Sequence, residues 1–152
     1  MTLRRSKGGR EMPTTTSTRI GFVGLGHMGG TMAARFLAAG YPVYGEERNR
    51  AHAQGLVHDG LQWRDTPREV TATAEIVITS LPDDRVLEAV ASGPDGILAG
   101  LDAEKIWVDM STVSPRASRE LAERVHELGA VMLDAPVSGS VPQVKAGTLT
   151  IM

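Results

Sequence analysis

Cysteine is absent from this sequence of 152 residues. Disulfide bonds, thiolate metal sites and cysteine nucleophiles are therefore excluded, and a reducing compartment is compatible with the composition, so we expect a cytoplasmic protein. An excess of charge of one sign is lacking as well, because sixteen basic and eighteen acidic residues leave a formal net charge of -2. We therefore expect neither a general nucleic-acid-binding surface nor a membrane-binding one.

Long hydrophobic runs are also missing, since no apolar stretch approaches the roughly 20 residues that span a bilayer. The N-terminal segment MTLRRSKGGREMPTTTSTR has basic residues but no hydrophobic stretch behind them, which is not typical of a secretory signal. A transit peptide is an alternative, but Glu11 and the lack of an amphipathic face favour a disordered tail over residues 1–18. The remainder, 19–152, has room for one domain with its own core.

From Arg19 onward, short β-branched runs alternate with segments of helical spacing. This alternation predicts an α/β fold of the Rossmann type, a doubly wound and mostly parallel sheet with helices on both faces. The expected strands are residues 20–24, 42–46, 61–63, 76–80, 106–109, 131–134 and 149–152. The expected helices are residues 27–39, 49–59, 66–72, 83–91 and 115–128.

The last of these helices has the clearest boundaries. Ser114 suits the N-cap, Pro115 suits the first helical position, and Gly129 follows the last apolar residue. One buried stripe is expected along it, formed by Ala117, Leu121, Val125 and Leu128. Asp83 and Asp84 are interpreted as a cap at a helix start and not as a catalytic pair. His52, His58 and His126 lack metal-ligand spacing, so no metal is indicated.

Five glycines fall within IGFVGLGHMGGT, residues 20–31. Gly24, Gly26 and Gly29 form G-x-G-x-x-G directly after a strand and directly before a helix, which is the context that a dinucleotide site requires. The first glycine permits a tight turn, the second lets the backbone approach a diphosphate, and the third lets the helix pack on the strand. Leu25, His27 and Met28 supply further backbone amides at the helix start. His27 is expected to contribute its amide and not its imidazole.

An acidic side chain stands about twenty residues further on, in Glu46-Glu47-Arg48. A carboxylate here can accept hydrogen bonds from the ribose hydroxyls of NAD, whereas an arginine can pair with the 2′-phosphate of NADP. Glu47 would repel a phosphate and favours NAD, while Arg48 keeps NADP open and could stack on adenine. The alternative is a tight strand-helix turn beside a solvated Glu47-Arg48 pair.

Four ordered motifs carry a resemblance to a known family: VGLGHMGGTMA, SLPDDRVLEAV, DMSTVSP and DAPVSGSVPQVKAGTLTIM. Residues 19–152 resemble the N-terminal half of the β-hydroxyacid dehydrogenases, which include 3-hydroxyisobutyrate, tartronate semialdehyde and 6-phosphogluconate dehydrogenases. The resemblance implies that Leu81 and Pro82 lie along the cofactor and that Ser111 and Thr112 lie beside its nicotinamide end. The alternative is an ordinary strand-to-helix corner at each motif.

The resemblance also implies a substrate site. Ser138 and Gly139 would hold the carboxylate of a small 3-hydroxy acid through hydroxyl and N–H groups, together with Ser140, which stands where the family usually has a second glycine. The catalytic residue of such enzymes is a lysine beyond residue 152, in an all-helical domain that also forms dimers or tetramers. Lys145 is interpreted as a surface lysine. An imine reductase and a non-catalytic binding module remain the alternative functions.

Overall fold

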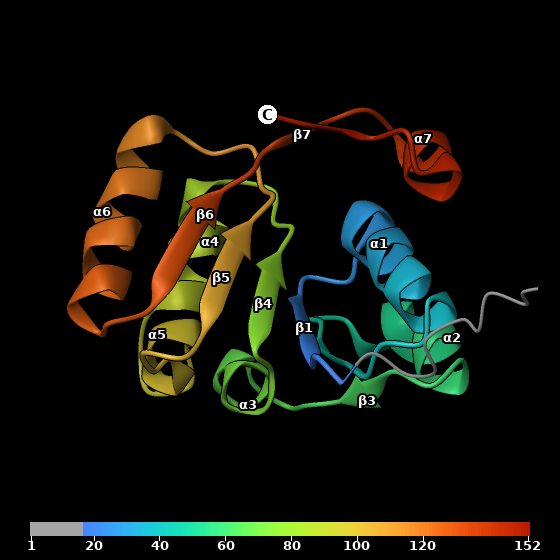
Figure 1. The fold of residues 1–152 in the computed structure, drawn as a ribbon, viewed down its shortest axis with the longest axis horizontal. Coiled ribbons are helices and arrows are strands. Elements are labelled where there is room, and N and C mark those ends of the chain that lie inside the picture. The colour runs from blue at the N-terminus through green and yellow to red at the C-terminus, as the bar shows by residue number, and fades with distance from the viewer. Residues whose placement is uncertain (1–16) are drawn as a thin grey trace, which may run out of the picture.

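The structure is a computed structural model and describes residues 17–152 (Figure 1). The expected N-terminal tail therefore lies outside the described residues except for its last two positions. In the described part of the chain, no helix combines the length and the apolar character needed to cross a membrane.

Six parallel strands form the central sheet, in the order β3-β2-β1-β4-β5-β6. They are β1 (Ile20–Val23), β2 (Val43–Glu46), β3 (Gln62–Trp63), β4 (Ile76–Thr79), β5 (Ile106–Asp109) and β6 (Val131–Asp134). This order is that of doubly wound dinucleotide-binding folds, so the predicted fold class is confirmed. The strand order reverses between β1 and β4, and ligands of such sheets bind at the carboxyl ends beside that point.

Helices cover both faces of the sheet. They are α1 (His27–Ala38), the 3-10 turn η1 (Arg50–Ala53), α2 (Gln54–His58), α3 (Pro67–Thr73), α4 (Asp84–Ala91), α5 (Ile97–Gly100), α6 (Pro115–Glu127) and α7 (Val141–Ala146). One face packs against α3, α4, α5 and α6 around the fully buried Trp107 and Val77. The other packs against α1, α2 and α7 around Phe22 and Met32. All four residues of β1 are buried because both faces of this central strand are covered.

The expected helix boundaries follow from local caps. The Ser114 hydroxyl accepts a hydrogen bond from the Ala117 N–H (3.2 Å), and Gly129 follows α6 at a φ of +78°. Asp83 caps α4 in the same way. Asp84 has a different role, because its carboxylate accepts hydrogen bonds from the N–H (2.8 Å) and hydroxyl (2.5 Å) of Ser114. These bonds lower the pKa of Asp84 and tie α4 to α6.

Several expectations need correction. The helix expected over 49–59 is η1 followed by α2, because the Asn49 side chain accepts from the Ala51 N–H (3.2 Å) and starts a tighter turn. The strand expected over 149–152 is β8 (Thr150–Ile151), which pairs antiparallel with β7 (Val137–Ser138) outside the central sheet. Leu128 is 43% exposed because it is the C-cap of α6 and lies past the buried stripe. The short elements α5, α7 and β7 were not predicted, since so few residues show no periodicity.

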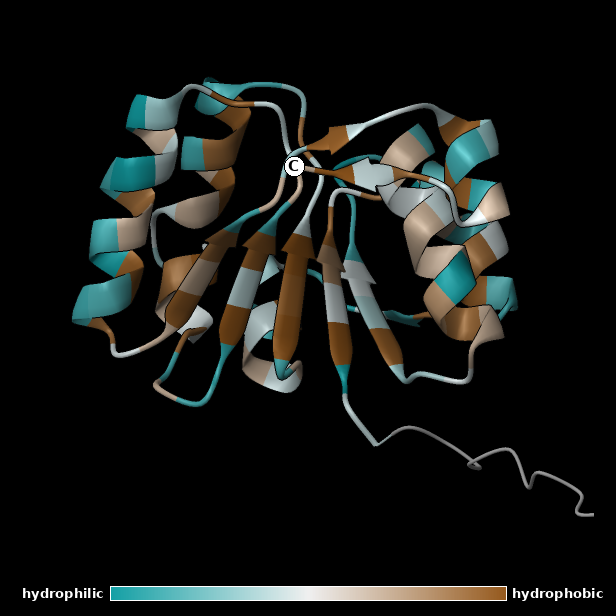
Figure 2. Ribbon diagram, turned by 45° about the horizontal axis from the view of Figure 1, so that its top comes forward, coloured by the Kyte–Doolittle hydropathy of each residue, from teal (hydrophilic) through white to brown (hydrophobic). Residues whose placement is uncertain are grey.

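One edge of the sheet has apolar side chains in contact with solvent. Figure 2 views the strands as mostly hydrophobic ribbons, with helices gathered to either side. Val131 and Leu133 of the edge strand β6 are each 50% exposed. In residues 17–152, β6 therefore has one covered face, through Met132, and one open face.

Candidate functional site

The glycine loop joins β1 to α1 through two close backbone contacts. Gly24 has a φ of +91°, and a Cβ there would lie 2.6 Å from the Ser80 carbonyl oxygen. A Cβ on Gly29 would lie only 2.0 Å from the Gly24 carbonyl oxygen. The first and third glycines therefore allow the turn and the strand-helix contact that the motif predicts.

Gly26 differs from its two neighbours in the motif. A Cβ on this residue would meet no atom within 4 Å, and its φ of −64° and ψ of −164° suit residues other than glycine. It is the N-cap of α1, so the backbone N–H groups of the first turn point past it without partners inside the helix. The fold does not require a glycine here, whereas a bound diphosphate would.

The acidic residue at the end of β2 contacts this loop directly. Glu47 accepts a hydrogen bond from the Leu25 N–H at 2.7 Å and one from the Asn49 N–H at 3.3 Å. Each carboxylate oxygen keeps a second lone pair for a ribose hydroxyl. The Arg48 side chain next to it is exposed. Glu47 therefore has a structural contact that the sequence did not predict, in the position expected of a ribose ligand.

A cavity of about 730 Å³ opens beside these residues, between the loops that follow β1, β2 and β4 and the helix α4. Gly26, Glu47 and Arg48 line one side of it, and Leu81 and Pro82 line the other. Six of the twelve cofactor residues predicted from the sequence thus meet at one cavity, whereas Leu25, His27, Met28, Gly29, Ser111 and Thr112 do not line it. Its apolar wall and acidic rim fit an adenosine, and the open Gly26 backbone fits the attached diphosphate.

Glu46 also lines this cavity, and its burial together with the nearby Glu47 carboxylate raises its pKa to about 7 from an ordinary 4.5. The folded chain thus keeps a proton that the unfolded chain loses, so this contribution to stability is present below pH 4.5 and is lost as pH rises through 7. We expect Glu46→Gln to raise the melting temperature at pH 8 by about 2–4 °C, with little change at pH 4.5, since partial exposure limits the effect. Thermal melts between pH 4.5 and 8 measure it.

The matched control is Glu123→Gln, which removes an exposed carboxylate on α6. If the pH profiles of the two variants coincide, burial of Glu46 does not contribute to stability in this way.

Ser111 and Thr112, which follow β5, differ in exposure. Ser111 is 3% exposed, and its hydroxyl oxygen accepts a hydrogen bond from the Leu81 N–H at 2.9 Å. Thr112 is exposed. The buried Ser111 therefore stabilises the loop that contains Leu81. Thr112 is the one of the two whose side chain is accessible to a ligand.

The segment expected to hold a substrate carboxylate crosses the carboxyl edge of the sheet from β6 to α7 (Figure 1). Ser138, Gly139 and Ser140 are all exposed, and Gly139 has a φ of +141°. The Ser140 N–H donates to Gln143 Oε1 at 2.8 Å, and the Ser140 hydroxyl bonds the same atom, which gives a capping box for α7. In this structure Ser140 therefore has a local partner, which the sequence did not predict.

Helix α7 packs on α1, which places this segment next to the glycine loop. Arg35 of α1 donates from Nη1 to the carbonyl oxygens of Val144 (3.0 Å) and Lys145 (2.6 Å) at the end of α7. Val144 is buried against α1. One helix therefore bears the glycine loop at its N-terminus and contacts, along its side, the helix α7 that follows Ser140.

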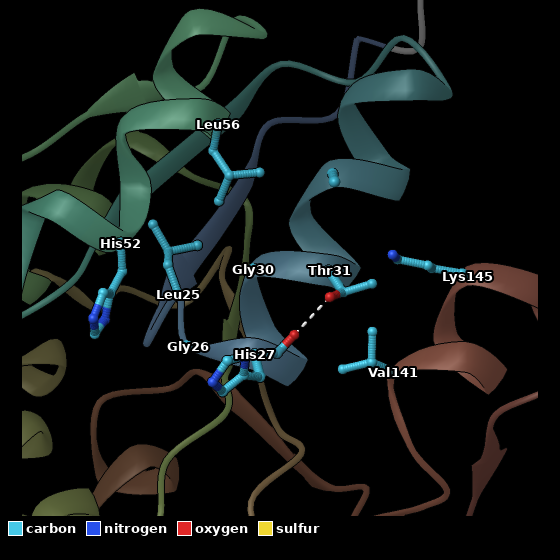
Figure 3. Close-up of a pocket in the computed structure, with 10 residues that line it drawn as sticks. Leu25, Gly26, His27, Gly30, Thr31, His52, Leu56, Val141 and Lys145 are labelled. Carbon is cyan, nitrogen blue, oxygen red and sulfur yellow. Dashed lines mark hydrogen bonds between the residues drawn. The ribbon is translucent and has the colours of Figure 1, made fainter.

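A second cavity, of about 540 Å³, lies on the other side of the glycine loop, between α1, α2 and α7 (Figure 3). Gly26 and His52 line both cavities. Lys145 reaches toward it from α7 with an exposed side chain, in agreement with its interpretation as a surface lysine. His27 bonds Thr31 through its backbone carbonyl oxygen (2.6 Å). Within residues 17–152, no cluster of three or more His, Asp or Glu side chains could hold a metal ion.

Comparisons with known proteins agree with a dinucleotide site at this position. The family model described as the NAD binding domain of 6-phosphogluconate dehydrogenase matches residues 19–152. The chain is 41% identical over 136 residues to 2-(hydroxymethyl)glutarate dehydrogenase of Eubacterium barkeri, covering 90% of the chain and 45% of that protein. It is 40% identical over 135 residues to 3-hydroxyisobutyrate dehydrogenase of Pseudomonas aeruginosa, covering 89% and 45%. The chain thus spans less than half the length of these curated relatives.

Solved structures give the same result. Mycobacterium tuberculosis 3-hydroxyisobutyrate dehydrogenase with L-serine superposes with a TM-score of 0.82 at 35% identity, covering 90% of this chain and 46% of that one. An imine reductase of Streptomyces aurantiacus superposes with a TM-score of 0.73 at 34% identity, covering 82% and 43%. The hydroxyacid dehydrogenase matches more of the chain.

Proposed function

The chain belongs to the family of NAD-binding domains of 6-phosphogluconate dehydrogenase, and we propose that it is the cofactor domain of an NAD(P)-dependent 3-hydroxyacid dehydrogenase. One observation gives the main support for dinucleotide binding. Gly26 stands at the start of α1 where nothing in the fold demands a glycine, and it borders a cavity with a carboxylate at its rim. A diphosphate with an attached ribose explains both features.

NAD is the cofactor that the site favours over NADP. Glu47 lies at the cavity rim and is anchored by the Leu25 N–H, so its negative charge is held where the 2′-phosphate of NADP would approach the ribose position. Arg48 is exposed and offers the opposing charge. The anchored carboxylate is the better fixed of the two, which supports a preference for NAD.

Titration of the protein with NADH and NADPH tests this preference. We expect tighter binding of NADH, and we expect Glu47→Gln to narrow the ratio of the two dissociation constants by about tenfold, or about 1.4 kcal/mol, because the repulsion of the phosphate is lost. Nucleotide fluorescence or calorimetry measures it, with Glu123→Gln as the control for loss of a distant carboxylate. A wild-type preference for NADPH, or a ratio unchanged in Glu47→Gln, contradicts the role of Glu47.

For the full-length protein we propose a small 3-hydroxy carboxylate as substrate, of the 3-hydroxyisobutyrate or tartronate semialdehyde type. Exposed Ser138 and Gly139 lie on the segment next to the glycine loop and can donate hydrogen bonds to a carboxylate. A dinucleotide held at Gly26 and Glu47 would supply the hydride acceptor for oxidation of such a substrate, and the family likeness assigns the proton transfer to a lysine outside the described residues. Assays of the full-length protein with a panel of hydroxyacids test the substrate class.

Two other functions predict different results. An imine reductase would reduce imines with NADPH and would not oxidise hydroxyacids; the serine-rich segment after β6 favours the hydroxyacid. A non-catalytic binding module would bind dinucleotide without turnover even at full length. A dimer or tetramer of the full-length protein is proposed from the family likeness.

A further inference from the structure

The carboxyl ends of β4 and β5 are linked by buried hydrogen bonds that meet at Asp109. This residue is fully buried, and its Oδ1 accepts a hydrogen bond from the Thr79 hydroxyl at 2.7 Å. The Thr79 hydroxyl oxygen in turn accepts from the Trp107 indole N–H at 2.9 Å. Trp107 is the largest fully buried side chain of the core, so Oδ1 of Asp109 is held in a fixed place.

The same oxygen reaches the ligand-binding edge of the sheet. Asp109 Oδ1 also accepts from the Ser111 N–H at 3.1 Å, and the Ser111 hydroxyl oxygen accepts from the Leu81 N–H at 2.9 Å. Two residues that follow different strands are thereby fixed relative to each other. Asp109 was not predicted as a functional residue, although a carboxylate that ends a buried strand just before Ser111 marks the position.

The Ser80-Leu81 segment is in direct contact with the glycine loop. A Cβ on Gly24 would lie 2.6 Å from the Ser80 carbonyl oxygen and 2.9 Å from the Leu81 Cδ2 atom. Leu81 also lines the cavity of about 730 Å³. A shift of the Leu81 backbone would therefore change the wall of that cavity and its fit against Gly24.

We propose that Asp109 is a positioning residue for the dinucleotide, acting through Ser111 to hold Leu81 against the glycine loop. This inference rests on the proposed function only in naming the dinucleotide as the ligand. The hydrogen bonds that hold Leu81 can be measured without it.

In this role Asp109 acts through the position of its acceptor oxygen Oδ1 and not through its negative charge. Both bonds from Thr79 and Ser111 go to Oδ1, while Oδ2 has no hydrogen-bond partner among residues 17–152. Burial raises the pKa of Asp109, and the Asp134 carboxylate adds to this rise. Asparagine keeps an acceptor oxygen at Oδ1, so it should replace aspartate in this role.

The test compares Asp109→Asn, Asp109→Ala and Ser111→Ala with the wild-type protein, with two readouts. Hydrogen exchange at the Leu81 amide reports the bond to Ser111 in the absence of any nucleotide. Titration with NADH reports binding. Ser118→Ala is the matched control, because Ser118 is also buried, on α6, away from the cavity.

We expect Ser111→Ala and Asp109→Ala to speed exchange at Leu81 and to weaken NADH binding roughly tenfold or more, since the partly buried Leu81 N–H loses its acceptor in the first variant and the buried Ser111 N–H loses its acceptor in the second. Asp109→Asn should stay within about threefold of wild type in both readouts, and Ser118→Ala should change neither. The pattern of rescue by asparagine is what a general loss of stability would not give.

Three results would overturn the inference: unchanged Leu81 exchange in Ser111→Ala, faster exchange with unchanged NADH affinity, or Asp109→Asn as damaging as Asp109→Ala. Failure of the wild-type protein to bind NADH or NADPH would sink the proposed function instead, and with it the part of the inference that concerns the dinucleotide. The Leu81 exchange rates would still decide whether Asp109 positions this loop.

Discussion

Gly26→Val is expected to abolish detectable binding of NADH while leaving the fold intact, a loss of roughly a hundredfold or more in affinity. A side chain on Gly26 meets no protein atom within 4 Å, and the backbone angles of this residue are accessible to valine. The branched side chain would instead occupy the space over the first turn of α1, where the diphosphate would contact backbone amides. Calorimetry or fluorescence titration measures the affinity, and circular dichroism with thermal melting measures the fold.

The control is Gly55→Val on α2, because a Cβ on Gly55 also meets nothing within 4 Å and Gly55 lines neither cavity beside the glycine loop. Its NADH affinity should equal that of the wild type. Wild-type affinity in Gly26→Val would mean that no ligand approaches the backbone at this glycine, and the dinucleotide site would then have to be placed elsewhere.

Gly29→Ala is expected to have the opposite pattern, with a large loss of stability. Its Cβ would lie 2.0 Å from the Gly24 carbonyl oxygen, a backbone atom that cannot move without shifting the whole loop, and 3.3 Å from the Ser80 Cβ. Alanine ordinarily stabilises a helix interior by about 0.5–1 kcal/mol relative to glycine. The clash should exceed this gain and cost about 3 kcal/mol or more in the free energy of unfolding.

Urea unfolding of Gly29→Ala measures this loss, and Gly55→Ala provides the matched helical glycine without a clash. Gly55→Ala should be as stable as the wild type or slightly more stable. A Gly29→Ala variant with wild-type stability would show that the strand and helix need not approach as closely as in this structure.

Local chemistry made the first half of the site predictable from the sequence. Gly24, Gly26 and Gly29 are separated by only a few residues, and each has a steric requirement that can be stated before a structure exists. The cap at Ser114 and the stop at Gly129 are local in the same sense. The fold class followed because strands that alternate with helices predict a parallel sheet with helices on both faces.

Contacts between distant segments were beyond such reasoning. The bond from the Leu25 N–H to Glu47 spans 22 residues, and that from the Leu81 N–H to Ser111 spans 30. Neither leaves a periodic pattern in the sequence. The same holds for the short β7–β8 pair, whose strands have two residues each.

Arg35 of α1 couples the position of α1 to that of α7. Its guanidinium holds two carbonyl groups of the segment that follows Ser140, so any tilt of α1 carries that segment along. A dinucleotide that settles on the amino end of α1 would therefore also set the place of the serines proposed to meet the acid.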